Sequence, residues 1–215
     1  MKKFFIALIA TFSLSAVPKA VVFDFGGVLK QESARKIVVQ FICDSFQCTE
    51  LELETFHQMY SPLKTSTSEV DFWMSYAQEK GIPLPSDWPA RFKAILKESI
   101  GVNPAMYDLI EELKQKNVQI GLLSNTTERR ANLVREFGFY EPFAPCLLSH
   151  EIGANKPDML AYQILLNTLT LPAQDVLFID DKMENVRAAK DLGIDAILFQ
   201  SEAQLRADLK KKGIL

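Results

Sequence analysis

The 215-residue chain has only three cysteines and two histidines, which limits the metal and redox chemistry that it can carry. Cys43, Cys48 and Cys146 show no spacing typical of a zinc site, and their odd number leaves one thiol free even if a disulfide forms. Cysteines of this kind usually act as small buried hydrophobic residues. The cysteines therefore indicate no zinc site and leave the cellular compartment open.

The sequence also lacks a block of Lys and Arg, and its net charge is −3. A nucleic-acid-binding protein would show a basic stripe, so we expect no nucleic-acid partner. No apolar run reaches the roughly 20 residues that a membrane span needs, so we expect no stable membrane anchor. The composition, 48% apolar and 24% charged, suits one folded domain or a domain with a modest insertion.

The first residues depart from this ordinary composition. Lys2 and Lys3 precede an apolar run from Phe4 to Ala16, and small residues surround the end of that run. This is the pattern of a secretory signal peptide. We therefore predict a signal peptide over residues 1–16 and a periplasmic or secreted location. The alternative is an additional core element at the start of a cytoplasmic enzyme.

Apolar runs of strand length alternate with amphipathic helical stripes from about residue 104 onward. We expect strands at residues 118–123, 145–148, 176–179 and 196–199, with an earlier one at 21–25. This alternation predicts an α/β protein, a Rossmann-like parallel sheet with helices on both faces. Residues 17–32 and 101–215 are expected to form this core.

The stretch from residue 33 to 100 does not follow the same alternation. Aromatic and aliphatic residues recur there at helical spacing, as in Phe72, Trp73 and Tyr76, and in Trp88 and Phe92. We predict that residues 33–100 form an all-helical insertion, with these aromatic side chains in its core.

Reactive side chains follow four of the predicted strands. In an open parallel sheet, ligands bind beyond the carboxyl ends of the strands, so these side chains are expected to meet at one edge. The candidates are Asp24, Ser124, Asn125, Lys156, Asp180 and Asp181.

The residue types in this set point to phosphoryl chemistry. Three carboxylates at one site repel each other unless a cation neutralises them, and Mg²⁺ prefers oxygen ligands and bridges to phosphate. A carboxylate such as Asp24 can then attack phosphorus and form an aspartyl-phosphate. Lys156 and the Ser124 hydroxyl would neutralise and orient the phosphoryl oxygens.

Four segments, residues 22–29, 123–126, 153–158 and 178–186, resemble in order the four motifs of the haloacid dehalogenase superfamily. The resemblance implies that Asp24 is the nucleophile, Ser124 a phosphate ligand and Lys156 a charge clamp. It also implies that Asp180 and Asp181 hold the metal directly or through water, and that the insertion is a cap. The chain looks closest to the branch with α-glucose-1-phosphatases and the phosphatase domain of soluble epoxide hydrolases.

Two further positions bear on this resemblance. Asn125, beside Ser124, is expected to contribute to phosphate binding because of its place after a strand. Asn185, in the last motif, is either a neighbour of the acidic pair or an ordinary helix-surface residue.

One position departs from the family pattern. Most phosphatases of the superfamily carry a second Asp two positions after the nucleophile, as general acid and base, and this chain has Gly26 there. The family binds metal through the backbone carbonyl at that position, so Gly26 is still expected to be a metal ligand. The proton transfer lacks its usual group, and His150 is a minor candidate to replace it.

The predicted function is a Mg²⁺-dependent phosphatase that acts on a small phosphorylated metabolite, a sugar phosphate being favoured. One alternative is a metal-independent dehalogenase, which also attacks with an aspartate but does not normally retain the acidic pair. Another is a non-catalytic binding protein on the same fold. The sequence leaves the exact substrate and the oligomeric state open.

Overall fold

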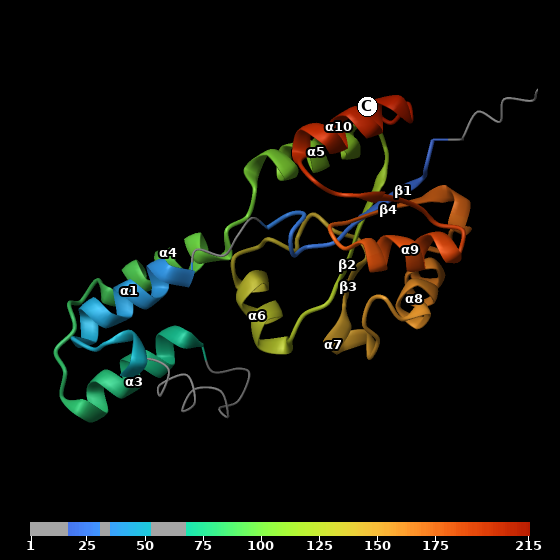
Figure 1. Ribbon diagram of the computed structural model, residues 1–215. Helices are drawn as coiled ribbons and strands as arrows, with labels where there is room; N and C mark the ends of the chain where they lie inside the picture. Colours follow the sequence, from blue (N-terminus) through green and yellow to red (C-terminus); the bar gives the residue numbers. More distant parts are fainter. Residues whose placement is uncertain (1–16, 31–34, 53–67) are drawn as a thin grey trace, which may run out of the picture.

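A computed structural model of the chain describes residues 17–30, 35–52 and 68–215 (Figure 1). The predicted signal peptide, residues 1–16, lies outside the described residues. Two parts of the predicted insertion, residues 31–34 and 53–67, lie outside them as well.

The described chain contains a parallel sheet of five strands in the order β3-β2-β1-β4-β5. Every neighbouring pair in this sheet runs parallel, which confirms the predicted α/β fold class. β1 lies in the middle and all four of its side chains are fully buried. The strands are β1 (Ala20–Phe23), β2 (Gln119–Ser124), β3 (Cys146–Leu148), β4 (Val176–Asp180) and β5 (Asp195–Leu198).

Helices cover both faces of the sheet because successive strand residues point to opposite sides. Val21 and Phe23 of β1 pack with α5 (Pro104–Gln115), α6 (Glu128–Glu136) and α10 (Glu202–Lys211). Ala20 and Val22 pack on the other side with α8 (Met159–Leu169) and α9 (Met183–Asp191). Two short elements complete the core, α7 (Ser149–Ile152) and the 3₁₀ helix η1 (Ala173–Asp175).

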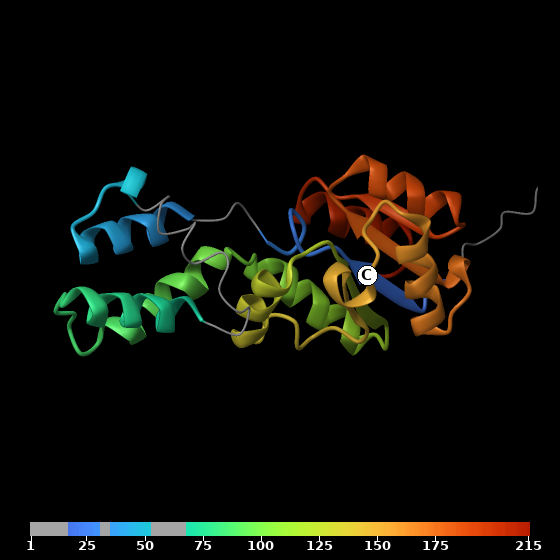
Figure 2. The same ribbon diagram turned by 90° about the horizontal axis from the view of Figure 1, so that it is seen from below.

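The described helices between Lys30 and Val102 form a helical insertion, here named the insertion, which lies at one end of the molecule in both views (Figures 1 and 2). Its described helices are α1 (Arg35–Phe46), α3 (Glu69–Lys80) and α4 (Trp88–Ile100). They enclose a separate aromatic core around Trp73, Trp88 and Phe92. The Trp88 indole N–H donates a 2.8 Å hydrogen bond to Ser45 Oγ, so this large side chain is satisfied although buried.

The chain enters and leaves the insertion at adjacent positions of the sheet domain. The segments on either side of the insertion form a bridge between Lys30 and Val102, and the backbone N–H of Asn103 donates to the carbonyl of Leu29 at 2.8 Å. The chain therefore leaves and re-enters the sheet domain at adjacent positions.

Helix α6 of the sheet domain forms a second connection to the insertion. Leu133 on α6 and Phe137, the residue that follows α6, pack against the aromatic core of the insertion. Lys93 on α4 forms a 2.6 Å ion pair with Glu136 on α6.

Among the described residues, no helix is long and apolar enough to span a membrane.

Candidate active site

The register of the sheet brings the candidate residues to one edge. Phe23 pairs with Leu122 on one side and with Ile179 on the other. The next residue, Asp24, continues this pairing because its N–H donates to the Ile179 carbonyl at 2.8 Å. The carboxyl ends of β1, β2 and β4 therefore lie side by side, and Asp180 ends β4 at the same level as Asp24.

Lys156 links two of the carboxylates at this edge. Its Nζ atom donates to Asp24 Oδ1 at 2.7 Å and to Asp180 Oδ2 at 2.6 Å. The Lys156 side chain is 1% exposed, and Nζ also lies 5.2 Å from the centroid of the Phe178 ring. A buried ammonium group is stable only when it is paired and hydrogen-bonded, as this one is. Lys156 is therefore a fixed charge of the site, held against the carboxylate expected to act as nucleophile.

Asp180 is fully buried and hydrogen-bonded at both oxygens. Besides Lys156, it accepts from the backbone N–H of Lys182 at 2.8 Å, and Asn185 Nδ2 lies 3.0 Å from each oxygen. A carboxylate has about four lone-pair positions for accepting hydrogen bonds, and these donors fill those of Asp180. Asn185 thus lies beside the acidic pair, and its backbone carbonyl accepts from the Tyr162 hydroxyl at 2.9 Å.

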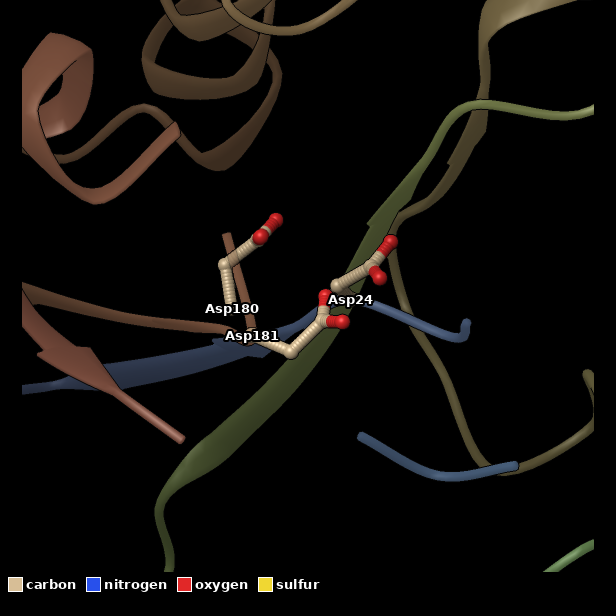
Figure 3. A group of neighbouring side chains, drawn as sticks. All are labelled: Asp24, Asp180 and Asp181. Carbon is tan, nitrogen blue, oxygen red and sulfur yellow. The ribbon is translucent and has the colours of Figure 1, made fainter. Parts of the chain in front are cut away.

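Asp181 is the exposed member of the acidic pair, and it lies against the loop that follows β1. A Cβ atom built on Gly27 would be 2.2 Å from Asp181 Oδ2, so the carboxylate occupies the space that a side chain at Gly27 would need. Gly27 has φ +79°, a conformation that favours glycine. Asp24, Asp180 and Asp181 each offer an oxygen within 4.8 Å of the others (Figure 3).

The site carries more negative charge than Lys156 balances. Burial raises the pKa of Asp24 from 3.8 to about 6; the Lys156 charge opposes this shift and the Asp180 charge adds to it. Burial, and then the charge of Asp180, also raise the pKa of Asp181. Each shift shows that the ionised carboxylates are disfavoured in the metal-free protein, and a bound cation would relieve this.

Ser124 and Asn125 follow directly along β2. Ser124 is buried at the end of the strand and pairs with Leu148 of β3. The Asn125 amide contacts the main chain of Lys156 twice: its Nδ2 donates to the Lys156 carbonyl at 2.7 Å, and its Oδ1 accepts from the Lys156 N–H at 2.8 Å. Nothing in the sequence motifs pointed to this pairing, because the two residues are 31 positions apart.

The structure also places the two residues that bear on proton transfer. A Cβ atom built on Gly26 would have Asp24 Oδ2 as its nearest neighbour, at 3.8 Å, so the position has room for a Cβ atom. His150 lies on α7, where its Nε2 is 3.7 Å from Glu151, and Glu151 pairs with Arg135. His150 is thus directed toward this surface pair.

With the geometry known, comparison with other proteins defines the class. Residues 18–193 match the model of the haloacid dehalogenase-like hydrolases, so the chain belongs to this family, as the four motifs predicted. The sesquiterpene phosphatase astK of Aspergillus oryzae is 26% identical over 180 residues, which cover 82% of this chain and 87% of the relative. The chain is therefore a hydrolase with phosphatases among its relatives.

Other relatives match over shorter stretches. A phosphorylated carbohydrates phosphatase of Thermotoga maritima is 26% identical over 106 residues, 49% of each chain. Bifunctional epoxide hydrolase 2 of Sus scrofa is 27% identical over 170 residues, which cover 70% of this chain and 30% of the relative. The chain spans less than half the length of several curated relatives that it matches.

Solved structures show the same fold. A haloacid dehalogenase family enzyme of Bacteroides thetaiotaomicron, determined with magnesium and inorganic phosphate, superposes with a TM-score of 0.56 at 20% identity. The superposition covers 87% of this chain and 98% of that one. At this identity the likeness establishes the fold, which agrees with the sheet order and the helical layers described above.

Proposed function

We propose that the protein is a Mg²⁺-dependent phosphatase that hydrolyses a small phosphorylated metabolite through an aspartyl-phosphate on Asp24. The observation that carries this proposal is the placement of Asp24 beside the buried Lys156 ammonium group at 2.7 Å, with the carboxylate of Asp181 next to it. The arrangement combines a nucleophile, a fixed cation and a place for a second cation at one edge of the sheet.

The residues present fit a magnesium ion. Asp24 and Asp181 would hold it with carboxylate oxygens, and Gly26 with its backbone carbonyl, a donor set typical of Mg²⁺. Asp180 already has hydrogen-bond donors at both oxygens, so it would favour the ion by its negative charge and not as a direct ligand. When bound, Mg²⁺ would supply charge neutralisation for the phosphoryl oxygens.

The protein groups would act as follows. An Asp24 oxygen attacks phosphorus, the P–O bond of the ester breaks, and the departing alkoxide takes a proton from water. A second water molecule then attacks phosphorus, the bond to Asp24 breaks, and phosphate and the free carboxylate remain. Lys156 holds Asp24 in place and stabilises the charge of the transferring phosphoryl group. The Ser124 hydroxyl would donate to a phosphoryl oxygen from the end of β2.

A sugar phosphate is the substrate class that we favour. The support is the resemblance to α-glucose-1-phosphatases and the relative named as a phosphorylated carbohydrates phosphatase.

We further propose that residues 33–100 act as a cap that selects the substrate. Residues 1–16 would direct export, which N-terminal sequencing of the protein from its native cell would test.

A phosphate-release screen over sugar phosphates, with and without Mg²⁺, tests the proposal. We expect turnover that disappears in excess chelator and returns when Mg²⁺ is added. Asp24→Asn serves as the matched inactive control, since an amide cannot form the aspartyl-phosphate. Full activity in chelator would exclude the metal mechanism, and halide release from a 2-haloacid without phosphate release would favour the dehalogenase alternative.

A further inference from the structure

The hydrogen bonds between Asn125 and the backbone of Lys156 connect two loops that lie far apart in the sequence. One loop follows β2 and carries Ser124; the other joins α7 to α8 and carries Lys156. The Asn125 amide donates at 2.7 Å and accepts at 2.8 Å, so both ends of the amide contact the same residue. Such a paired contact fixes the position and the direction of the Lys156 backbone together.

The direction of this backbone determines where the ammonium group lies. The Lys156 side chain is 1% exposed and its Nζ must reach Asp24 and Asp180 at the same time. A lysine side chain is a flexible four-carbon stem, so without a fixed backbone the buried ammonium group could adopt other positions and lose one of these partners. The two ion pairs hold the ammonium end of Lys156, and the Asn125 contacts hold its backbone.

We infer that Asn125 is a positioning residue, which acts through Lys156 and not as a phosphate ligand. This inference rests on the proposed function, because the purpose of holding Lys156 is to stabilise phosphoryl transfer at Asp24. It also revises the expectation from the sequence, in which Asn125 contributes to phosphate binding directly.

Chemical labelling tests the positioning role without relying on activity. Acetylation of lysines by acetic anhydride, followed by mass spectrometry, measures the reactivity of Lys156 relative to the exposed Lys190. We expect Lys156 to react slowly in the wild type and at least severalfold faster in Asn125→Ala. Asn155→Ala is the matched control, because Asn155 is exposed and adjacent to Lys156, and it should leave the labelling unchanged.

A double-mutant cycle on phosphatase activity tests the consequence for catalysis. A displaced catalytic group can cost roughly 10²-fold in rate, so Asn125→Ala should lower kcat by about 10- to 100-fold with little change in KM. In the Lys156→Ala background, the same substitution should cost nothing further. Asn125→Asp keeps the acceptor for the Lys156 N–H, so its labelling should be intermediate, which provides a second variant if Asn125→Ala folds poorly.

Two results would overturn the inference. Unchanged labelling of Lys156 in a folded Asn125→Ala protein would show that Asn125 does not hold it. Losses that multiply in the double mutant would show that Asn125 contacts the substrate on its own. If the wild type releases no phosphate, the proposed function fails, but the labelling still decides whether Asn125 positions Lys156.

Discussion

The Asp181 carboxylate fills the space that a side chain at Gly27 would need, since a Cβ atom on Gly27 would lie 2.2 Å from Asp181 Oδ2. Gly27→Ala must therefore displace the Asp181 carboxylate, and φ of +79° adds strain to the variant. Gly26→Ala is the matched neighbour, where the nearest heavy atom to the new methyl group is 3.8 Å away.

We expect Gly27→Ala to weaken Mg²⁺ binding at least tenfold, and Gly26→Ala to change it little. Isothermal titration calorimetry of both variants measures the two affinities. Equal Mg²⁺ affinities in the two variants would mean that Asp181 is not a ligand of the ion.

Asp24→Asn should abolish turnover and yet stabilise the metal-free protein at pH 7 to 8. The pKa of Asp24 is raised from 3.8 to about 6. Its contribution to stability is therefore complete below pH 3.8 and is lost as the pH rises through about 6. At 1.36 kcal/mol per pH unit, this shift corresponds to about 3 kcal/mol.

Urea unfolding in chelator, at pH 5 and at pH 8, measures the effect of Asp24. The difference in unfolding free energy between variant and wild type should be larger at pH 8. A variant less stable than the wild type at pH 8 would contradict the raised pKa.

Lys156→Ala should remove the cation that faces the transferring phosphoryl group. Loss of one such electrostatic stabiliser typically costs 10²–10³ in rate, so we expect a loss of about that size in kcat. Lys190→Ala, on the exposed surface of α9, controls for the removal of a positive charge. Steady-state kinetics at saturating Mg²⁺ gives the comparison, and a loss below about threefold would exclude a catalytic role, given the effect expected of such a group.

Because position 26 is a glycine, the hydrolysis rate of the wild type should depend on the leaving group of the substrate. General acid–base catalysis is worth roughly 10²–10⁴ in rate, and Gly26 cannot supply it. Rates should rise as the leaving alcohol becomes more acidic, so that aryl phosphates and sugar 1-phosphates exceed sugar 6-phosphates. If hydrolysis of the aspartyl-phosphate limits instead, rapid mixing should show a burst of alcohol release. A flat profile without a burst would contradict this prediction.

The structure allows the missing carboxyl group to be restored. Because a Cβ atom at Gly26 meets only an ordinary contact at 3.8 Å, Gly26→Asp should fold and should raise the rate for poor leaving groups more than for aryl phosphates. Gly26→Asn, of nearly the same shape but without an ionisable proton, is the control. Equal effects of the two substitutions on the substrate series would show that proton transfer is not what position 26 lacks.

The strands and the edge where the candidate residues meet could be predicted because they depend on local patterns. Short apolar runs indicated the five strands, and the residue after a parallel strand lies at the binding edge of the sheet whatever the packing around it. Asp24 and Asp180 were accordingly expected at the same edge. The prediction used only the sequence around each strand.

Other features could not be predicted because they depend on pairs of distant residues. The contact between Asn125 and Lys156 requires two loops to approach across the sheet edge, and neither loop contains a signal for the other. Asp180 and Asp181 are adjacent and chemically identical, yet one is buried with its lone pairs occupied and the other is exposed. That difference is determined by Lys156, Asn185 and Gly27, which come from three separate segments.

The bridge between Lys30 and Val102 makes the insertion a segment that can be removed or exchanged. Since the insertion begins and ends at adjacent positions, its removal or exchange would leave two chain ends that a short linker could join. The sheet strands and the residues that follow them need not change in such an exchange. Recombination, in evolution or in the laboratory, could thus replace the insertion as a module, while α6 and its C-terminal end, through Leu133, Glu136 and Phe137, would be the surface to adapt.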